Sequence, residues 1–199
     1  MFISWEGSMC RFRVITLSLA ALAIASVTGA QQSDKQAPKI FTLSGEMLRG
    51  YQSVQRNLVE AAEKMPEADY GFKPTPEIRP FGQLVAHAAL TQFGTCSLLK
   101  GEASPRKDEK EDAPRTRAEA IALLKASTEY CDPLVTPLTD TTMPEMVKTK
   151  DMQVAQGLLP ASLISHGQEM YGTMAVYLRL KGIVPPTTAR QAQEGKKSQ

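Results

Sequence analysis

Four stretches of this chain repeat apolar residues at steps of three and four, the period of an amphipathic helix, and this pattern constrains the fold more than any other feature. The first stretch covers residues 44–65, and its inward positions are Met47, Tyr51, Val54, Leu58, Ala62 and Met65. Pro66 follows and ends the pattern. A second helix is expected from about Phe81 to Lys100, with Gly101 as its stop signal.

The other two expected helices lie in the C-terminal half of the chain. The third begins at Thr116 and Glu119, which form a capping box because each side chain can satisfy a free backbone amide of the other residue. Its inward stripe consists of Ile121, Leu124, Thr128 and Cys131. The prolines within residues 133–137 are expected to kink or end it. The fourth helix has Pro160 near its first turn and Gly182 placed for a left-handed C-cap.

Long connections separate these helices. Residues 66–80 are rich in proline, residues 102–115 are dense in charge and predict a solvated loop, and residues 136–156 are expected to be irregular. No pair of strands and no internal repeat is evident in the pattern. The sequence therefore predicts an all-α fold, a bundle of four helices with long connecting loops.

The composition agrees with one compact soluble domain, since 42% of the 199 residues are hydrophobic and 22% are charged. The formal net charge is +2, and the basic residues are scattered among acidic ones instead of forming a stripe. Proteins that bind nucleic acid typically carry such a stripe, so no nucleic acid is expected as a partner.

The first thirty residues have the order of a secretory signal peptide. Arg11 and Arg13 precede an apolar run over residues 14–27, and a polar stretch follows from Gln31. The run is short for a membrane span, which needs about 20 residues. We therefore expect a signal peptide at residues 1–30, a secreted or periplasmic mature chain, and no membrane attachment after the signal is removed.

Removal of that segment leaves Cys96 and Cys131 as the two cysteines of the mature chain. An even number of cysteines in an oxidising compartment makes an intramolecular disulfide plausible. The alternative is a pair of buried free thiols that act as small hydrophobic residues. The sequence leaves both alternatives open.

His87 and His166 are the two histidines of the chain, and each lies on the apolar face of its expected helix. Helical bundles build metal sites from side chains that project inward from facing helices, and imidazole suits zinc, nickel, copper or iron. A catalytic zinc usually has three protein ligands. With two candidate ligands, the spacing alone favours satisfied core histidines over a metal site.

Two segments carry a resemblance to a known family. The stretch DYGFKPTPEIRPFGQLVAH, residues 69–87, and the run SHGQEMYGTMAVYLRLKGIVPP, residues 165–186, resemble the DinB-like family of proposed metal-dependent hydrolases. The resemblance extends from Met47 to Pro186 and implies an up-down-down-up four-helix bundle, often paired as a homodimer. In that family three histidines hold the metal, one from the second helix and two from the fourth helix separated by three residues.

The resemblance places His87 at the position on the second helix and His166 at the first position on the fourth helix. Met170 stands where the second histidine of the fourth helix is expected. A thioether is a weak ligand for zinc or nickel, although it suits copper(I). Glu169 is adjacent in sequence, but neighbouring helical positions point about 100° apart. The expected cofactor is a divalent metal, zinc or nickel, held by His87 and His166.

Two functional interpretations stay open. In the first, an exported DinB-like protein has a weakened metal site between helices two and four and acts on an unidentified small molecule, as a hydrolase or thiol transferase. Whether it is an enzyme, and through which catalytic residues, is undecided. In the second, the chain is a non-catalytic, metal-free bundle that serves as a binding or interaction module, with Met170 filling the core.

The expected organisation is a signal peptide at 1–30, a bundle domain at 40–186 and a disordered polar tail at 187–199. Gly167 and Gly172 fall inside the fourth helix, where each glycine costs about 1 kcal/mol relative to alanine. That cost suggests a close approach of another helix, from this chain or from a dimer partner.

Overall fold

The structure, a computed structural model, describes residues 39–149 and 151–197. The expected signal peptide at residues 1–30 lies outside these ranges. The described elements are α1 (Leu43–Lys64), the 3-10 helix η1 (Glu67–Asp69), α2 (Phe81–Lys100), α3 (Arg117–Val135), β1 (Met146–Lys148), β2 (Gln153–Ala155), α4 (Leu158–Leu180) and α5 (Pro186–Lys197). The four helices expected from the periodicity are therefore all present, with ends within a few residues of the expected ones.

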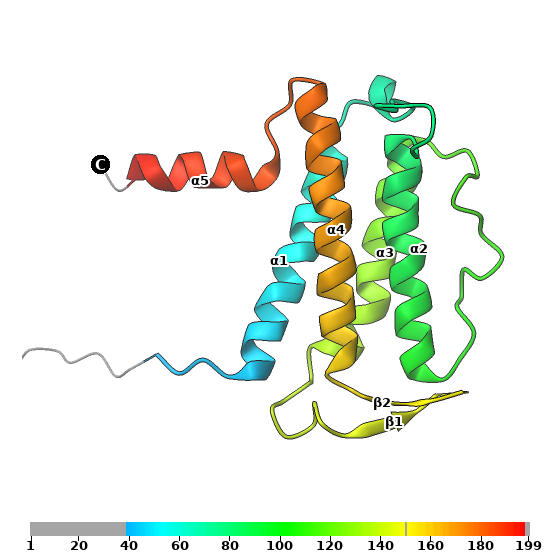
Figure 1. Ribbon diagram of the computed structural model, residues 1–199, viewed down its shortest axis with the longest axis vertical. Coiled ribbons are helices and arrows are strands. Elements are labelled where there is room, and N and C mark those ends of the chain that lie inside the picture. Colours follow the sequence, from blue (N-terminus) through cyan, green and yellow to red (C-terminus); the bar gives the residue numbers. More distant parts are fainter. Residues whose placement is uncertain (1–38, 150, 198–199) are drawn as a thin grey trace, which may run out of the picture. The chain divides into compact units, whose positions relative to one another are not determined.

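Helices α1 to α4 form a bundle in which α1 packs against α4 and α3, and α2 packs against α3 and α4. Figure 1 shows that α1 and α4 run in one direction and α2 and α3 in the other. This is the expected all-α, up-down-down-up arrangement. The loop at residues 101–116 makes it possible, because it returns along the length of α2 before α3 begins (Figure 1).

The close approach expected at Gly167 occurs inside the chain. A Cβ atom added at Gly167 would lie 2.2 Å from a methyl carbon of Val54, so α4 and α1 touch here with no room for a larger residue. A Cβ atom added at Gly172 would meet no atom within 4 Å apart from its two neighbouring residues and the adjoining backbone of α4. The first glycine therefore serves the packing of α4 on α1, and the second does not.

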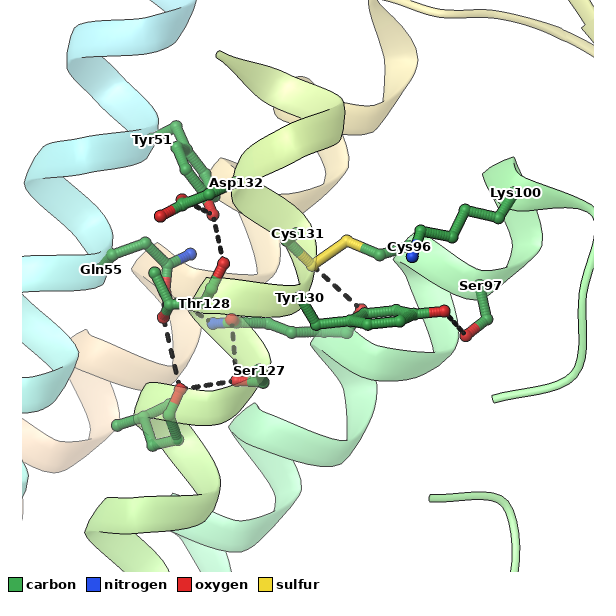
Figure 2. The surroundings of a disulfide bond; sticks show 12 residues. Tyr51, Gln55, Cys96, Ser97, Lys100, Ser127, Thr128, Tyr130, Cys131 and Asp132 are labelled. Atoms are coloured by element: carbon green, nitrogen blue, oxygen red, sulfur yellow. Dashed lines mark hydrogen bonds between the residues drawn. A yellow bond between two sulfur atoms is a disulfide. The ribbon is translucent and has the colours of Figure 1, made fainter. Parts of the chain in front are cut away.

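A disulfide joins α2 to α3. Cys96 and Cys131 are bonded, with their Cα atoms 5.6 Å apart, and both residues are fully buried (Figure 2). Beside it, the hydroxyl of Tyr51 donates a hydrogen bond of 2.8 Å to Asp132, which ties α1 to α3. Of the two alternatives open from the sequence, the structure has the disulfide.

Two segments differ from expectation. Residues 136–156 contain a short antiparallel hairpin, in which β1 pairs with β2 and Val147 faces Val154. Strands of three residues are too short to produce a recognisable alternating pattern in the sequence.

The tail at residues 187–199 was expected to be disordered, but its described part forms most of α5. That expectation is wrong because contacts with distant residues hold the helix. Arg190 binds Glu60 and Asn57 of α1, and Thr187 hydrogen-bonds with the hydroxyl of Tyr171.

Among residues 39–149 and 151–197, no helix is both long and apolar enough to span a membrane.

Candidate metal site

The structure brings the two histidines together. His87 lies in the second turn of α2 and His166 near the middle of α4, and their Nε2 atoms are 3.3 Å apart. The ring centroids are 5.2 Å apart, with the ring planes at 66° to each other. Residues next to each histidine in the chain are buried, but both histidine side chains are partly exposed. Two side chains separated by 79 residues thus meet at one point between α2 and α4.

A carboxylate lies behind the first histidine. The Nδ1 atom of His87 is 2.6 Å from Oε1 of Glu111, and the other carboxylate oxygen is 3.4 Å from a guanidinium nitrogen of Arg79. Burial alone would raise the pKa of Glu111, but the hydrogen bond from His87 and the charges of His87 and Arg79 outweigh it and lower this pKa below its usual value. An ionised carboxylate only accepts hydrogen bonds. His87 therefore donates through Nδ1, and its Nε2 atom lies within hydrogen-bond distance of Nε2 of His166.

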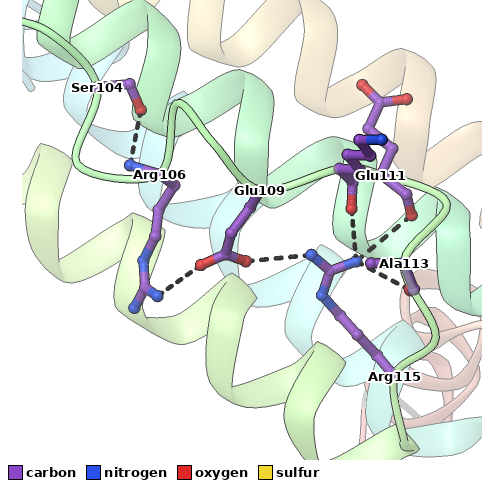
Figure 3. Close-up of polar contacts among 7 residues, drawn as sticks. Ser104, Arg106, Glu109, Glu111, Ala113 and Arg115 are labelled. Atoms are coloured by element: carbon purple, nitrogen blue, oxygen red, sulfur yellow. Dashed lines mark hydrogen bonds and ion pairs between the residues drawn. The ribbon is translucent and has the colours of Figure 1, made fainter.

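Glu111 was not among the residues predicted for the site, because it lies in the charged loop at residues 102–115, which was expected to be solvated. Most of that loop is exposed, yet ion pairs hold it in place (Figure 3). Glu109 bridges Arg106 at 2.6 Å and Arg115 at 3.1 Å. Arg115 also donates to the backbone carbonyls of Lys110, Glu111 and Ala113. No local signal in the sequence shows that one carboxylate of this loop reaches a histidine 24 residues earlier.

The segment before α2 is also anchored next to the site. The hydroxyl of Tyr177, on α4, donates a hydrogen bond of 2.7 Å to the backbone carbonyl of Arg79. Tyr177 is buried. This bond links the backbone of the Arg79 segment to the helix that carries His166.

The electrostatics of the site favour a neutral second histidine. Burial lowers the pKa of His166 below its ordinary value, and the nearby charge of His87 lowers it further. Since an unperturbed histidine titrates near pH 6.5, His166 is mostly neutral at pH 7. A neutral imidazole is the form that binds a metal ion.

The separation of the two histidines matches the geometry of a bound metal ion. Two imidazole nitrogens bound to one tetrahedral ion at about 2.0–2.1 Å lie about 3.3–3.4 Å apart, and the observed separation of the two Nε2 atoms is 3.3 Å. A carboxylate behind a ligating histidine is the usual arrangement around protein metals. Across the part of the chain that the structure describes, no group of three or more His, Cys, Asp or Glu could hold an ion. His87 and His166 therefore fit two adjacent coordination positions, and these residue types supply no third.

Met170 does not change that donor set. Its side chain is 6% exposed and belongs to the main hydrophobic core. Glu169 is exposed to solvent on the neighbouring face of α4. Met170, at the position where the resemblance implies a third histidine, thus contributes apolar volume to the core.

These observations define a class of protein, an all-α bundle with a histidine pair between its second and fourth helices. Comparison with protein families identifies that class further. The DinB superfamily matches residues 51–159, which is more than half of the chain, and the protein belongs to this superfamily. The matched range includes His87 and stops before His166 and Met170.

Solved structures share the fold. A DinB-like protein from Bacillus cereus has a TM-score of 0.60 and 16% identity, covering 73% of this chain and 96% of its own. A DinB-like protein from Bacillus subtilis has a TM-score of 0.54 and 22% identity, covering 69% and 92%. A conserved protein from Enterococcus faecalis has a TM-score of 0.53 and 16% identity, covering 71% and 98%. A search of curated proteins found no match.

Proposed function

We propose that this DinB-superfamily protein binds a divalent metal ion between α2 and α4 through His87 and His166. The observation that carries the proposal is the 3.3 Å separation of the two Nε2 atoms, with Glu111 behind His87. When bound, such an ion supplies Lewis acidity toward water or a thiol, which indicates a hydrolase or thiol transferase that acts on a small molecule.

The surrounding residues prepare the imidazoles for that role. Glu111 holds His87 in the tautomer that presents Nε2 between the helices, and partial burial keeps His166 neutral. Arg79 adds a positive charge at the rim, about half exposed and paired on one side with Glu111. Its free face is suited to an anionic group of a substrate.

The metal is expected to be zinc or nickel, because imidazole suits both ions. A site with two protein ligands binds more weakly than one with three, and water completes the coordination. Competition with a fluorescent chelator tests this directly. The parent should bind one zinc per chain, and His87→Ala and His166→Ala should each lose measurable binding. Met170→His restores the third family ligand and should tighten zinc binding, provided that the variant keeps its fold by circular dichroism.

A second candidate function has its own supporting observation. Met170 is buried in the core where the family pattern has a histidine, which fits a metal-free bundle that acts as a binding or interaction module. The same titration separates the candidates. Absence of zinc, nickel and copper binding by the parent, combined with binding by Met170→His, would favour the metal-free module.

We also propose export to the periplasm or cell exterior, with a signal peptide at residues 1–30. The disulfide between Cys96 and Cys131 supports this compartment, because such bonds persist in oxidising surroundings. Cell fractionation and the mass of the mature N-terminus, expected near Gln31, test the proposal. Pairing as a homodimer is proposed from the family resemblance, and light scattering during size-exclusion chromatography would measure it.

A further inference from the structure

The face of the bundle that carries the histidines also carries an apolar pocket. This cavity of about 230 Å³ lies between α2, α4 and the hairpin strand β2. Its lining includes Thr95, Leu98, Met152, Val154, Leu158 and Ser162. No residue of the metal site takes part in this lining, so the pocket is a separate feature that the proposed metal chemistry leaves unexplained.

Helix geometry places the pocket next to the histidine pair along the same two helices. On α2, Thr95 lies eight residues after His87, and residues four apart share one face of a helix. On α4, Ser162 lies four residues before His166. Because α2 and α4 run antiparallel, both steps lead toward the same end of the bundle (Figure 1). Along the helix axes the pocket therefore begins roughly 6 Å from the histidine pair on α4 and roughly 12 Å from it on α2.

The pocket wall is strongly apolar, although it is open to solvent. Leu98, Met152 and Leu158 are 47%, 53% and 54% exposed, and each borders the cavity. Large apolar side chains gathered around one concavity are typical of a ligand site. Thr95 and Ser162 place hydroxyls on the wall, on the two helices that carry the histidines. The arrangement suits a ligand with one apolar end and one polar end.

We propose that this pocket holds the apolar part of a small amphiphilic substrate, whose polar reacting group lies at the histidine pair. The proposal rests on the proposed function of that pair. A dry cavity of about 150 Å³ accommodates benzene, so the pocket has room for a somewhat larger ring or a short alkyl chain. The substrate class is thus a short-chain or aryl-substituted compound with a polar head group, not a small polar metabolite.

A chain-length series of hydroxamates tests the proposal. Acetohydroxamate, butanohydroxamate, hexanohydroxamate and octanohydroxamate share one metal-binding head group and differ only in their alkyl chain. Calorimetry on the zinc-treated protein should show affinity rising about threefold to fourfold per added methylene until the pocket is full. The variant Ser162→Phe, at an exposed position of the lining, should abolish this rise. Val176→Phe adds the same ring at another exposed position of α4 and should leave the rise intact.

The two proposals fail in different ways. Zinc content, measured on every variant, reports on the histidine pair and should be the same in Ser162→Phe as in the parent. The dependence of affinity on chain length reports on the pocket. Equal affinities for all four hydroxamates, or an unchanged rise in Ser162→Phe, would overturn the pocket proposal even with stoichiometric zinc. If the parent binds no zinc but hydroxamate affinity still rises with chain length, the metal site is overturned and the pocket proposal is supported.

Discussion

The packing of α4 on α1 gives a sharp prediction from two glycines of one helix. Gly172→Ala should stabilise the protein by about 1 kcal/mol, because alanine favours the helix and the new methyl group has no atom within 4 Å apart from its two neighbouring residues and the adjoining backbone of α4. Gly167→Ala gains the same helix propensity, but its methyl carbon would lie 2.2 Å from a methyl carbon of Val54. Favourable carbon contacts lie at about 3.5–4.0 Å, so the helices would have to separate by more than 1 Å.

Val54 has little freedom to relieve this clash. It is fully buried, and a valine in a helix has one strongly preferred rotamer. Overpacking of this kind costs about 1–3 kcal/mol, and the severity of the overlap points to the upper end. After the gain in propensity, Gly167→Ala should be about 2 kcal/mol less stable than the parent. The two alanine variants should therefore differ by about 3 kcal/mol.

Urea unfolding followed by circular dichroism at 222 nm measures this difference. For a domain of this size, 1 kcal/mol corresponds to about 2–4 °C in Tm, so thermal unfolding gives a second readout. Val54→Ala in the Gly167→Ala background should recover part of the loss, with a coupling of at least about 1 kcal/mol in the double-mutant cycle. Equal stability of Gly167→Ala and Gly172→Ala would refute the close contact between α1 and α4.

Three further perturbations have defined outcomes. Replacing Cys96 and Cys131 with serine removes the disulfide between residues that are 35 positions apart in the chain. This change should lower the free energy of unfolding by about 4 kcal/mol, measured against the parent in urea. Glu111→Ala should weaken zinc binding about tenfold to a hundredfold, because it releases the histidine that Glu111 orients. Asp112→Ala removes a neighbouring charge and should leave zinc binding unchanged. Equal effects of the two variants in a chelator titration would contradict the orienting role of Glu111. Thr116→Ala should cost about 1 kcal/mol in thermal unfolding, because it removes the side chain that accepts from the backbone amide at the start of α3.

Local patterns in the sequence were sufficient to locate the four bundle helices. The capping box of Thr116 and Glu119 is present at the start of α3, and Gly101 adopts the left-handed conformation expected at the end of α2. These features depend on residues close together in the chain. Pro133 shows the limit of such rules, since α3 continues two residues past it to Val135. A proline in the last turn removes one backbone hydrogen bond close to the C-terminal end, where the last carbonyl groups of a helix lack partners within the helix in any case.

Contacts between distant residues account for what the sequence did not predict. Helix α5 depends on Arg190 reaching Glu60 and Asn57, 130 and 133 residues away. The position of Glu111 depends likewise on the charged loop returning to α2. At the site itself, helical periodicity placed both histidines on inward faces where they could meet, although the spacing alone favoured core residues over a metal site. The metal interpretation came from the family resemblance. The carboxylate behind His87 had no sequence signal.

Metal content of untagged protein, purified from the compartment in which it accumulates, tests the central claim most directly. Mass spectrometry should find close to one divalent ion per chain in the parent and none in the double variant His87→Ala, His166→Ala. Circular dichroism should show that both proteins are folded. A parent without metal, even after dialysis against zinc, nickel and copper, would contradict the proposed site. It would show instead that the histidine pair meets between α2 and α4 without holding an ion.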